Sequence, residues 1–183
     1  IQVAAEGAAL LKNENSALPL ASGSKVTLLG MGSHVPMYDI AQGAAGIGNR
    51  DQITSFEEAF GDRGLQLNPT MISFYDGLKD KYPPAYQGSY TGAGTVIIGE
   101  VPQSEYGSAQ TGSFAGYNDA AIIFLERNVG EGGDLPDNPA AANLVSDGVH
   151  DGLQINNDER DLIKLAKANF PKVIVLLNSS NPI

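Results

Sequence analysis

The chain alternates between short apolar runs and segments with a helical period. Residues 26–30, 120–125 and 172–177 are apolar runs bounded by Gly, Ser or other polar residues. Runs of this kind are typical of strands that are buried on both faces, as in a parallel sheet. Residues 95–98 have the same character, and residues 65–67 are a shorter strand candidate.

Helix signals lie between these runs. Thr54 and Ser55 precede an apolar stripe that ends at Gly61, and Asn68 with Pro69 precedes a second stripe. Residues 156–159 (NNDE) form a capping signal for a third helix, and residues 4–12 show a helical pattern with no preceding cap. Strands that alternate with helices predict a parallel α/β sheet, and the uncapped start suggests a domain excised from a longer protein.

Composition narrows the class of protein. The chain has 183 residues, enough for one domain, and no apolar run is long enough to span a membrane. Its net charge of −10 disfavours nucleic acid and anionic lipid as partners. The absence of Cys excludes disulfides and thiolate chemistry but leaves the compartment open, and two His make a His-rich metal site improbable.

Negative charge is concentrated in residues 100–151. This stretch holds nine Asp and Glu against Arg127 alone, which is −8 of the total −10. A long single-signed stretch is more often a solvated surface than a binding site, so we interpret it as surface. An exception would be a carboxylate held near the end of a strand.

Ligands of parallel α/β sheets bind at the carboxyl ends of strands, which directs attention to the segment after residue 29. Gly30 and Gly32 begin like a dinucleotide fingerprint, but the third Gly is missing and no helix follows. A nucleotide-binding domain is therefore the weakest alternative. His34 and Asp39 are too few for a metal site, so an ordinary loop histidine is the favoured interpretation.

The segment after residue 125 carries more chemistry. Glu131 lies between Gly130 and Gly132, so its backbone can approach a ligand closely and its carboxyl can enter a cleft. Arg127 and Asp134 are placed to tune the local charge. From spacing alone, an acidic turn without function is the other interpretation of this segment.

The order of these motifs resembles the C-terminal α/β sandwich domain of family 3 glycoside hydrolases over nearly the whole chain. Residues 4–14 (AAEGAALLKNE) and 17–20 (ALPL) are similar to the entry helix and loop of that family. Residues 46–49 (GIGN) stand where the family has a Gly-Ser-Gly turn, and residues 130–134 (GEGGD) are similar to its Gly-Glu-Gly-x-Asp segment. Residues 172–182 (KVIVLLNSSNP) are similar to the following strand and loop.

The resemblance implies a three-layer sandwich over residues 1–183, with a mostly parallel central sheet and helices on both faces. It implies that Glu131 is the general acid/base of a retaining, exo-acting β-glycosidase that acts on a β-linked oligosaccharide or glycoside. Substrate contacts are then expected from Arg127, Asp134, Ile47, Gly48 and Asn49. The nucleophilic Asp belongs to a (β/α)8 barrel domain of the same polypeptide, so the isolated chain is expected to be inactive. No metal or organic cofactor is required.

Two positions depart from the family pattern. Ile47 stands where many relatives have a Ser that can hydrogen-bond the sugar, and Glu126 stands where a small residue is expected. Residues 98–102 (IGEVP) and the Tyr-rich insert before them are closer to a permuted subset, in which this domain precedes the barrel. The alternative function is a non-catalytic carbohydrate-binding or scaffolding domain; the absence of Trp weakens it, although seven Tyr are present.

Overall fold

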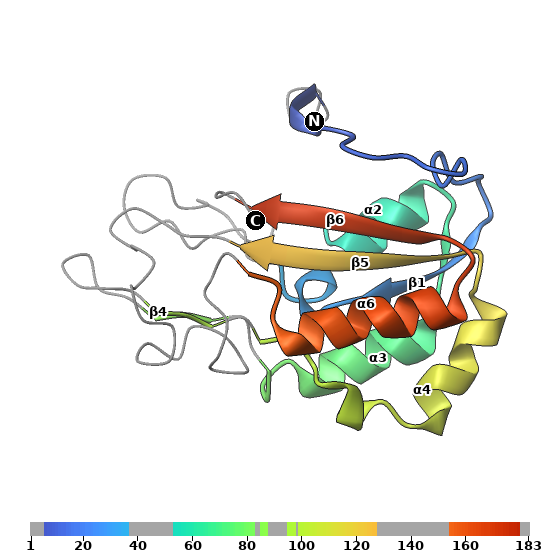
Figure 1. Cartoon of the computed structure of the whole chain (residues 1–183). Coiled ribbons are helices and arrows are strands. Elements are labelled where there is room, and N and C mark those ends of the chain that lie inside the picture. Colours follow the sequence, from blue (N-terminus) through green and yellow to red (C-terminus); the bar gives the residue numbers. More distant parts are fainter. Residues whose placement is uncertain are drawn as a thin grey trace.

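A four-stranded parallel sheet forms the centre of the protein. The structure is a computed structural model, and it describes residues 6–36, 53–82, 85–87, 95–97, 99–127 and 154–179. Within these residues the strand order is β2 (Gln66–Leu67), β1 (Lys25–Leu29), β5 (Ala120–Arg127) and β6 (Val173–Ser179). Figure 1 shows β1, β5 and β6. All neighbouring strands of this sheet are parallel.

The strands of the sheet end at different heights. Val26 pairs with Ala120 and Leu29 with Ile123, where β1 ends. The pairing of β5 with β6 continues as far as Arg127 and Ser179. The carboxyl ends of β5 and β6 therefore extend beyond the end of β1.

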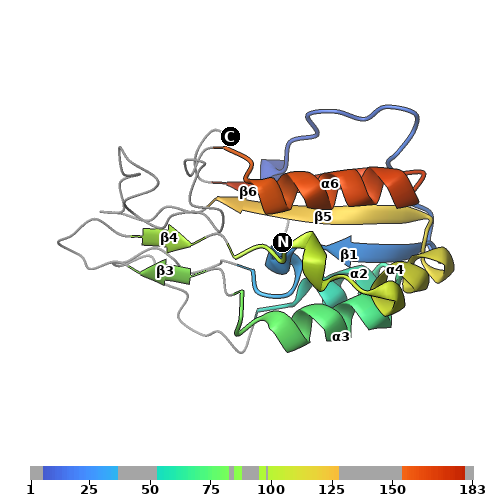
Figure 2. The same ribbon diagram turned by 60° about the horizontal axis from the view of Figure 1, so that its bottom comes forward.

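Helices cover both faces of the sheet (Figures 1 and 2). One face carries α3 (Pro69–Leu78), α4 (Ser108–Ser113) and α6 (Asn157–Asn169), and the other carries α2 (Phe56–Asp62). This arrangement confirms the three-layer sandwich expected from the sequence. Three short 3-10 turns complete the described helical structure: η1 (Met31–Ser33), η3 (Gln103–Glu105) and η4 (Phe114–Gly116).

Alternate side chains of the strands enter two separate cores. Leu29, Ala121, Ile123 and Leu125 face α3, α4 and α6, where they pack against Met71, Tyr75, Phe114, Leu162 and Ala166. Val26, Leu28, Ile122, Phe124 and Ile174 face the opposite side, where Phe56 and Phe60 of α2 cover them. Burial on both faces explains why β1 and β5 appear in the sequence as uniformly apolar runs. For β6 this expectation was wrong on one face, where Val175 and Leu177 are 41% and 49% exposed.

The capping signals predicted from the sequence are confirmed. Ser55 is the N-cap of α2, and its hydroxyl accepts a hydrogen bond from the backbone N–H of Glu58. Asn68 caps α3 ahead of Pro69, and Asn156 caps α6 in a reciprocal arrangement with Glu159. Each cap satisfies backbone donors that the first helical turn leaves without a partner.

The helix expected over residues 4–12 was wrong beyond its start. Residues 6 and 7 are helical, but residues 8–14 have no regular secondary structure, and Leu10 and Leu11 are 67% and 81% exposed. A short helix is marginal in water unless its apolar face packs against a partner. Within the described residues, the exposed side chains of Leu10 and Leu11 have no core to pack against, so the helical pattern in the sequence does not produce a helix.

The strand predicted at residues 95–98 is confirmed at Thr95–Ile97, but it does not join the parallel sheet. β4 (Thr95–Ile97) pairs antiparallel with β3 (Ala85–Gln87) in a separate two-stranded sheet. A short apolar run does not specify its pairing partner, which here comes from the preceding Tyr-, Pro- and Gly-rich segment. Among the helices that the structure describes, none has the length and apolar character needed to cross a membrane.

Candidate functional site at the carboxyl edge of the sheet

The turn that follows β1 lies against the neighbouring strand β5. Gly30 has φ of 96°, a conformation that side chains rarely adopt. A Cβ at this position would lie 2.6 Å from the carbonyl oxygen of Phe124 on β5. Glycine therefore allows the chain to leave β1 and form η1 directly beside β5.

A buried carboxylate, Glu126, contacts this turn from β5. Its side chain is only 6% exposed, and Asn178 on β6 donates a hydrogen bond from Nδ2 to Glu126 Oε1 at 2.9 Å. A Cβ on Gly32 would lie 2.8 Å from both Cγ and Cδ of Glu126. Glu126 therefore brings together the turn after β1 and the ends of β5 and β6.

A second buried carboxylate, Glu100, contacts the same turn. Its Oε2 accepts the backbone N–H of Met31 at 3.1 Å, and its Oε1 accepts the backbone N–H of Val101 at 2.7 Å. Burial raises the pKa of Glu100 to about 8, against the two backbone hydrogen bonds, which lower it. Through these hydrogen bonds, the Glu100 carboxyl group connects the segment after β4 to the turn after β1.

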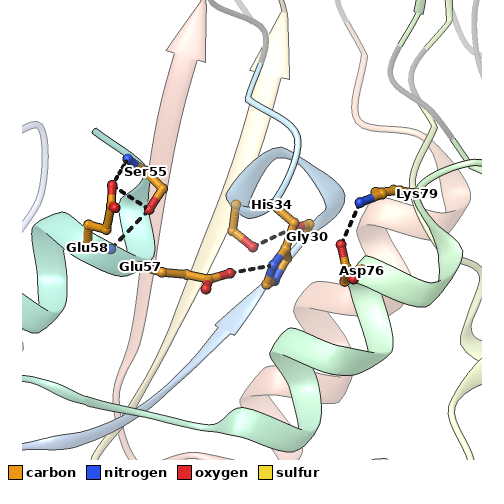
Figure 3. Close-up of polar contacts among 8 residues, drawn as sticks. Gly30, His34, Ser55, Glu57, Glu58, Asp76 and Lys79 are labelled. Atoms are coloured by element: carbon orange, nitrogen blue, oxygen red, sulfur yellow. Dashed lines mark hydrogen bonds and ion pairs between the residues drawn. The ribbon is translucent and has the colours of Figure 1, made fainter. Parts of the chain in front are cut away.

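A histidine–carboxylate pair lies beyond η1 (Figure 3). His34 Nδ1 is 3.1 Å from Glu57 Oε1 at the start of α2, and the imidazole stacks on Tyr75 of α3. Burial lowers the pKa of His34 to about 4, although the Asp76 carboxylate acts in the opposite direction. The imidazole is therefore neutral at neutral pH, with Nδ1–H donating to Glu57. Within the described residues, His34 Nε2 has no hydrogen-bond partner.

Within the described residues, His34 and Glu57 belong to no cluster suited to a metal ion. No group of three His, Asp or Glu side chains suited to a metal ion occurs in the portion of the chain that the structure describes. Asp39, the partner considered for His34 from the sequence, lies outside the described residues. His34 Nδ1 is instead hydrogen-bonded to Glu57. The sequence pattern did not reveal this contact, which joins the turn after β1 to the first turn of α2.

The structure places one of the predicted site residues. Arg127 is the last residue of β5, and its backbone pairs with Ser179 of β6 at the carboxyl edge of the sheet. The remaining predicted site residues, Glu131, Asp134, Ile47, Gly48 and Asn49, lie outside the described residues, so their roles stay predictions.

The interpretation of residues 100–151 as solvated surface was wrong for Glu100, and Glu126, near the end of β5, is the exception that the sequence analysis allowed. Glu100 is 4% exposed and Glu126 is 6% exposed. Glu126 directly follows Leu125 at the end of an apolar run, and Glu100 follows the run 95–98 after one glycine. An acid at or near the end of an apolar run was the available signal for burial.

Comparisons with known proteins agree with this architecture. The model of the glycosyl hydrolase family 3 C-terminal domain matches residues 8–183. The chain belongs to this family. It is 31% identical to beta-glucosidase A of Butyrivibrio fibrisolvens over 193 aligned positions, covering 97% of this chain and 22% of that protein. It is 27% identical to a beta-glucosidase of Ruminococcus albus, covering 98% of this chain and 17% of that protein.

Solved structures show the same fold. Beta-glucosidase 3B of Thermotoga neapolitana, solved in complex with α-D-glucose, superposes with a TM-score of 0.69 at 29% identity, over 96% of this chain and 23% of that one. A beta-glucosidase of Paenibacillus barengoltzii superposes with a TM-score of 0.75 at 23% identity, over 100% of this chain and 18% of that one. This family 3 domain thus spans about a fifth of the length of the relatives that it matches.

Proposed function

We propose that this chain is the sandwich domain of a retaining, exo-acting β-glycosidase that removes terminal β-linked sugars. The observation that carries the proposal is the position of the Gly-Glu-Gly segment in a domain of this family. Residues 130–132 follow β5 after a short connection, and β5 ends at the carboxyl edge, where parallel α/β sheets bind their ligands.

In the proposed mechanism, Glu131 acts twice. In the first step its protonated carboxyl group gives a proton to the leaving oxygen, while a nucleophilic Asp attacks the anomeric carbon from the opposite face of the sugar ring. In the second step the Glu131 carboxylate removes a proton from the water that cleaves the glycosyl-enzyme bond. Retention requires the two carboxyl groups to be about 5 to 5.5 Å apart.

The nucleophile belongs to the proposed partner, a (β/α)8 barrel of the same polypeptide. The much greater length of the relatives supports such a partner. The isolated chain would then supply half of the catalytic pair and be inactive by itself. The order in which this domain precedes the barrel remains part of the proposal, and it requires the barrel sequence to follow residue 183.

Around Glu131 we propose that Arg127 and Asp134 set the charge next to the bound sugar, and that Ile47, Gly48 and Asn49 form the second contact segment. Because the Ile47 side chain has no hydrogen-bonding group, sugar contact from this turn falls to backbone groups and Asn49. Replacing Ile47 with Ser would restore a hydroxyl at this position. It is expected to lower KM for the preferred glycoside.

The test is a Glu131→Gln variant of the full-length enzyme. Turnover of ordinary glycosides should fall by about 10²-fold or more, because proton transfer contributes on that order. Substrates with an activated leaving group should retain their first step, and azide should then accelerate release of the sugar. Asp161→Asn, which removes a surface carboxylate on α6 that pairs with Lys164, is the matched control. Unchanged turnover of ordinary glycosides by Glu131→Gln would overturn the proposal and favour a non-catalytic carbohydrate-binding role.

A further inference from the structure

Glu126 occupies a position where a buried carboxylate is costly. Removing a charged group from water is unfavourable unless hydrogen bonds compensate for the lost hydration. A small residue, as the family pattern leads one to expect at this position, would avoid that cost. An acid at this position therefore calls for a role beyond filling space.

Two segments hold the Glu126 side chain in one place. Asn178 holds Oε1 from the β6 side, and the backbone of η1 lies against the opposite side at Gly32. Because a Cβ at Gly32 would come within 2.8 Å of Cγ and Cδ, there is no room for a side chain between η1 and the carboxyl group. The Glu126 carboxyl group thus contacts both the turn that follows β1 and the end of β6.

The location of this link matters because the chain leaves the sheet immediately afterwards. Arg127 is the last residue of β5, and Glu131 follows four residues later. Beyond Leu29, β1 no longer pairs with β5, so in the described part of the sheet residues 124–127 have a strand neighbour on the β6 side alone. On the open side, the contact between Glu126 and η1 replaces the missing strand pairing.

We propose that Glu126 is a positioning residue, which fixes the end of β5 and thereby the direction in which the segment with the acid/base leaves the sheet. This inference rests on the proposed function of Glu131. Catalytic groups that are displaced by about 1 Å can lose about 10²-fold in rate. Loosening the end of β5 should therefore weaken proton donation more than it weakens substrate binding.

The experiment uses the full-length enzyme and substrates whose leaving groups differ in basicity. Poor leaving groups need the proton from the acid, whereas good ones do not. Glu126→Ser should lower kcat by about 10- to 100-fold on poor leaving groups, with little change on good ones and a small change in KM. Glu126→Gln, whose amide oxygen can still accept from Asn178, should recover most of this loss.

Further variants address the same contact from its other sides. Asn178→Ala removes the donor and should reproduce the leaving-group dependence of Glu126→Ser, with no further loss in the double variant. Gly32→Ala should do the same by displacing the carboxyl group. If Glu126→Ser does not fold, the same measurements on Asn178→Ala test the inference, because that variant removes the hydrogen bond and keeps the Glu126 carboxyl group.

The outcomes separate this inference from the proposed function. If Glu126→Ser and Asn178→Ala lower kcat equally on all substrates, or leave kcat at the value of the Asp161→Asn control, then Glu126 does not position the acid/base and the inference is overturned. If instead Glu131→Gln keeps full activity, it is the assignment of the acid/base that fails. A loss confined to poor leaving groups in the Glu126 and Asn178 variants, together with inactive Glu131→Gln, supports both.

Discussion

The imidazole of His34 stacks on the ring of Tyr75, with ring centroids 4.8 Å apart and planes inclined by 18°. The phenol oxygen of the same Tyr75 accepts the backbone N–H of Gly30 at 2.8 Å and contacts the hydroxyl of Tyr106. One tyrosine therefore supports both ends of the turn that follows β1. The protonation state of His34 consequently bears on the whole turn.

His34 predicts an acid-sensitive fold. The pKa of His34 is about 4 in the folded protein and 6.5 in the unfolded chain, so the unfolded chain binds more protons between these pH values. Stability should be full above pH 6.5 and fall as the pH decreases towards 4, by roughly 2 to 3 kcal/mol. His34→Phe, which keeps a ring against Tyr75, should remove this slope in urea unfolding measured from pH 4 to 7. An unchanged slope would show that another group is responsible.

Glu100 predicts the opposite slope. Burial raises its pKa from 4.5 to about 8, so the folded protein binds more protons over this range. The contribution of Glu100 to stability is present below pH 4.5 and is lost as the pH rises through 8. Glu100→Gln should abolish this decrease while weakening one of the two backbone hydrogen bonds, at a cost of about 1 to 3 kcal/mol. The measurement is the unfolding free energy from pH 5 to 9, and a variant that still loses stability over this range would contradict the assignment.

Gly30 predicts a large effect from one methyl group. Gly30→Ala combines a positive φ with a contact of 2.6 Å to the Phe124 carbonyl oxygen, neither of which side-chain motion can relieve. We expect a loss of about 2 kcal/mol or more. Gly77→Ala is the matched control, since Gly77 is exposed within α3 and a Cβ there meets nothing within 4 Å. That variant should be more stable by about 0.5 to 1 kcal/mol.

The outer strand β6 predicts self-association of the isolated chain. Val175 and Leu177 are 41% and 49% exposed, and β6 pairs only with β5 in the described sheet. Exposed apolar side chains on an edge strand favour pairing with another molecule. Sedimentation velocity should show association that increases with concentration, and Val175→Lys should reduce it. A chain that stays monomeric at high concentration would show that this edge is protected.

The buried elements were predictable because their local signals agree with their surroundings. The strands around Leu28, Ile123 and Ile174 are apolar on both faces, and Asn68 and Asn156 supply caps whose chemistry is local to the helix end. Packing then selects the conformation that the local pattern already favours.

Other features depend on partners that are distant in the sequence. Residues 8–12 have helical periodicity but no surface to pack against, and β4 takes its partner from a hairpin. The site shows the same limit: the pairs of Glu126 with Asn178 and His34 with Glu57 span 52 and 23 residues. The acid/base assignment to Glu131 came from family resemblance, since an acid between two glycines does not by itself define a catalytic role.

The unequal lengths of β1 and β5 leave an extension of the described sheet that is formed by β5 and β6. β5 runs four residues past Ile123, the last partner of β1, and at about 3.3 Å per residue this amounts to about 13 Å. β5 therefore ends beyond the end of β1, beside the last residue of β6, and its residues 124–126 are still buried. Because Phe124 and Leu125 in this extension belong to the two cores, deleting two of its residues would withdraw the segment after β5 by about 7 Å and also remove core side chains, so position and stability would change together.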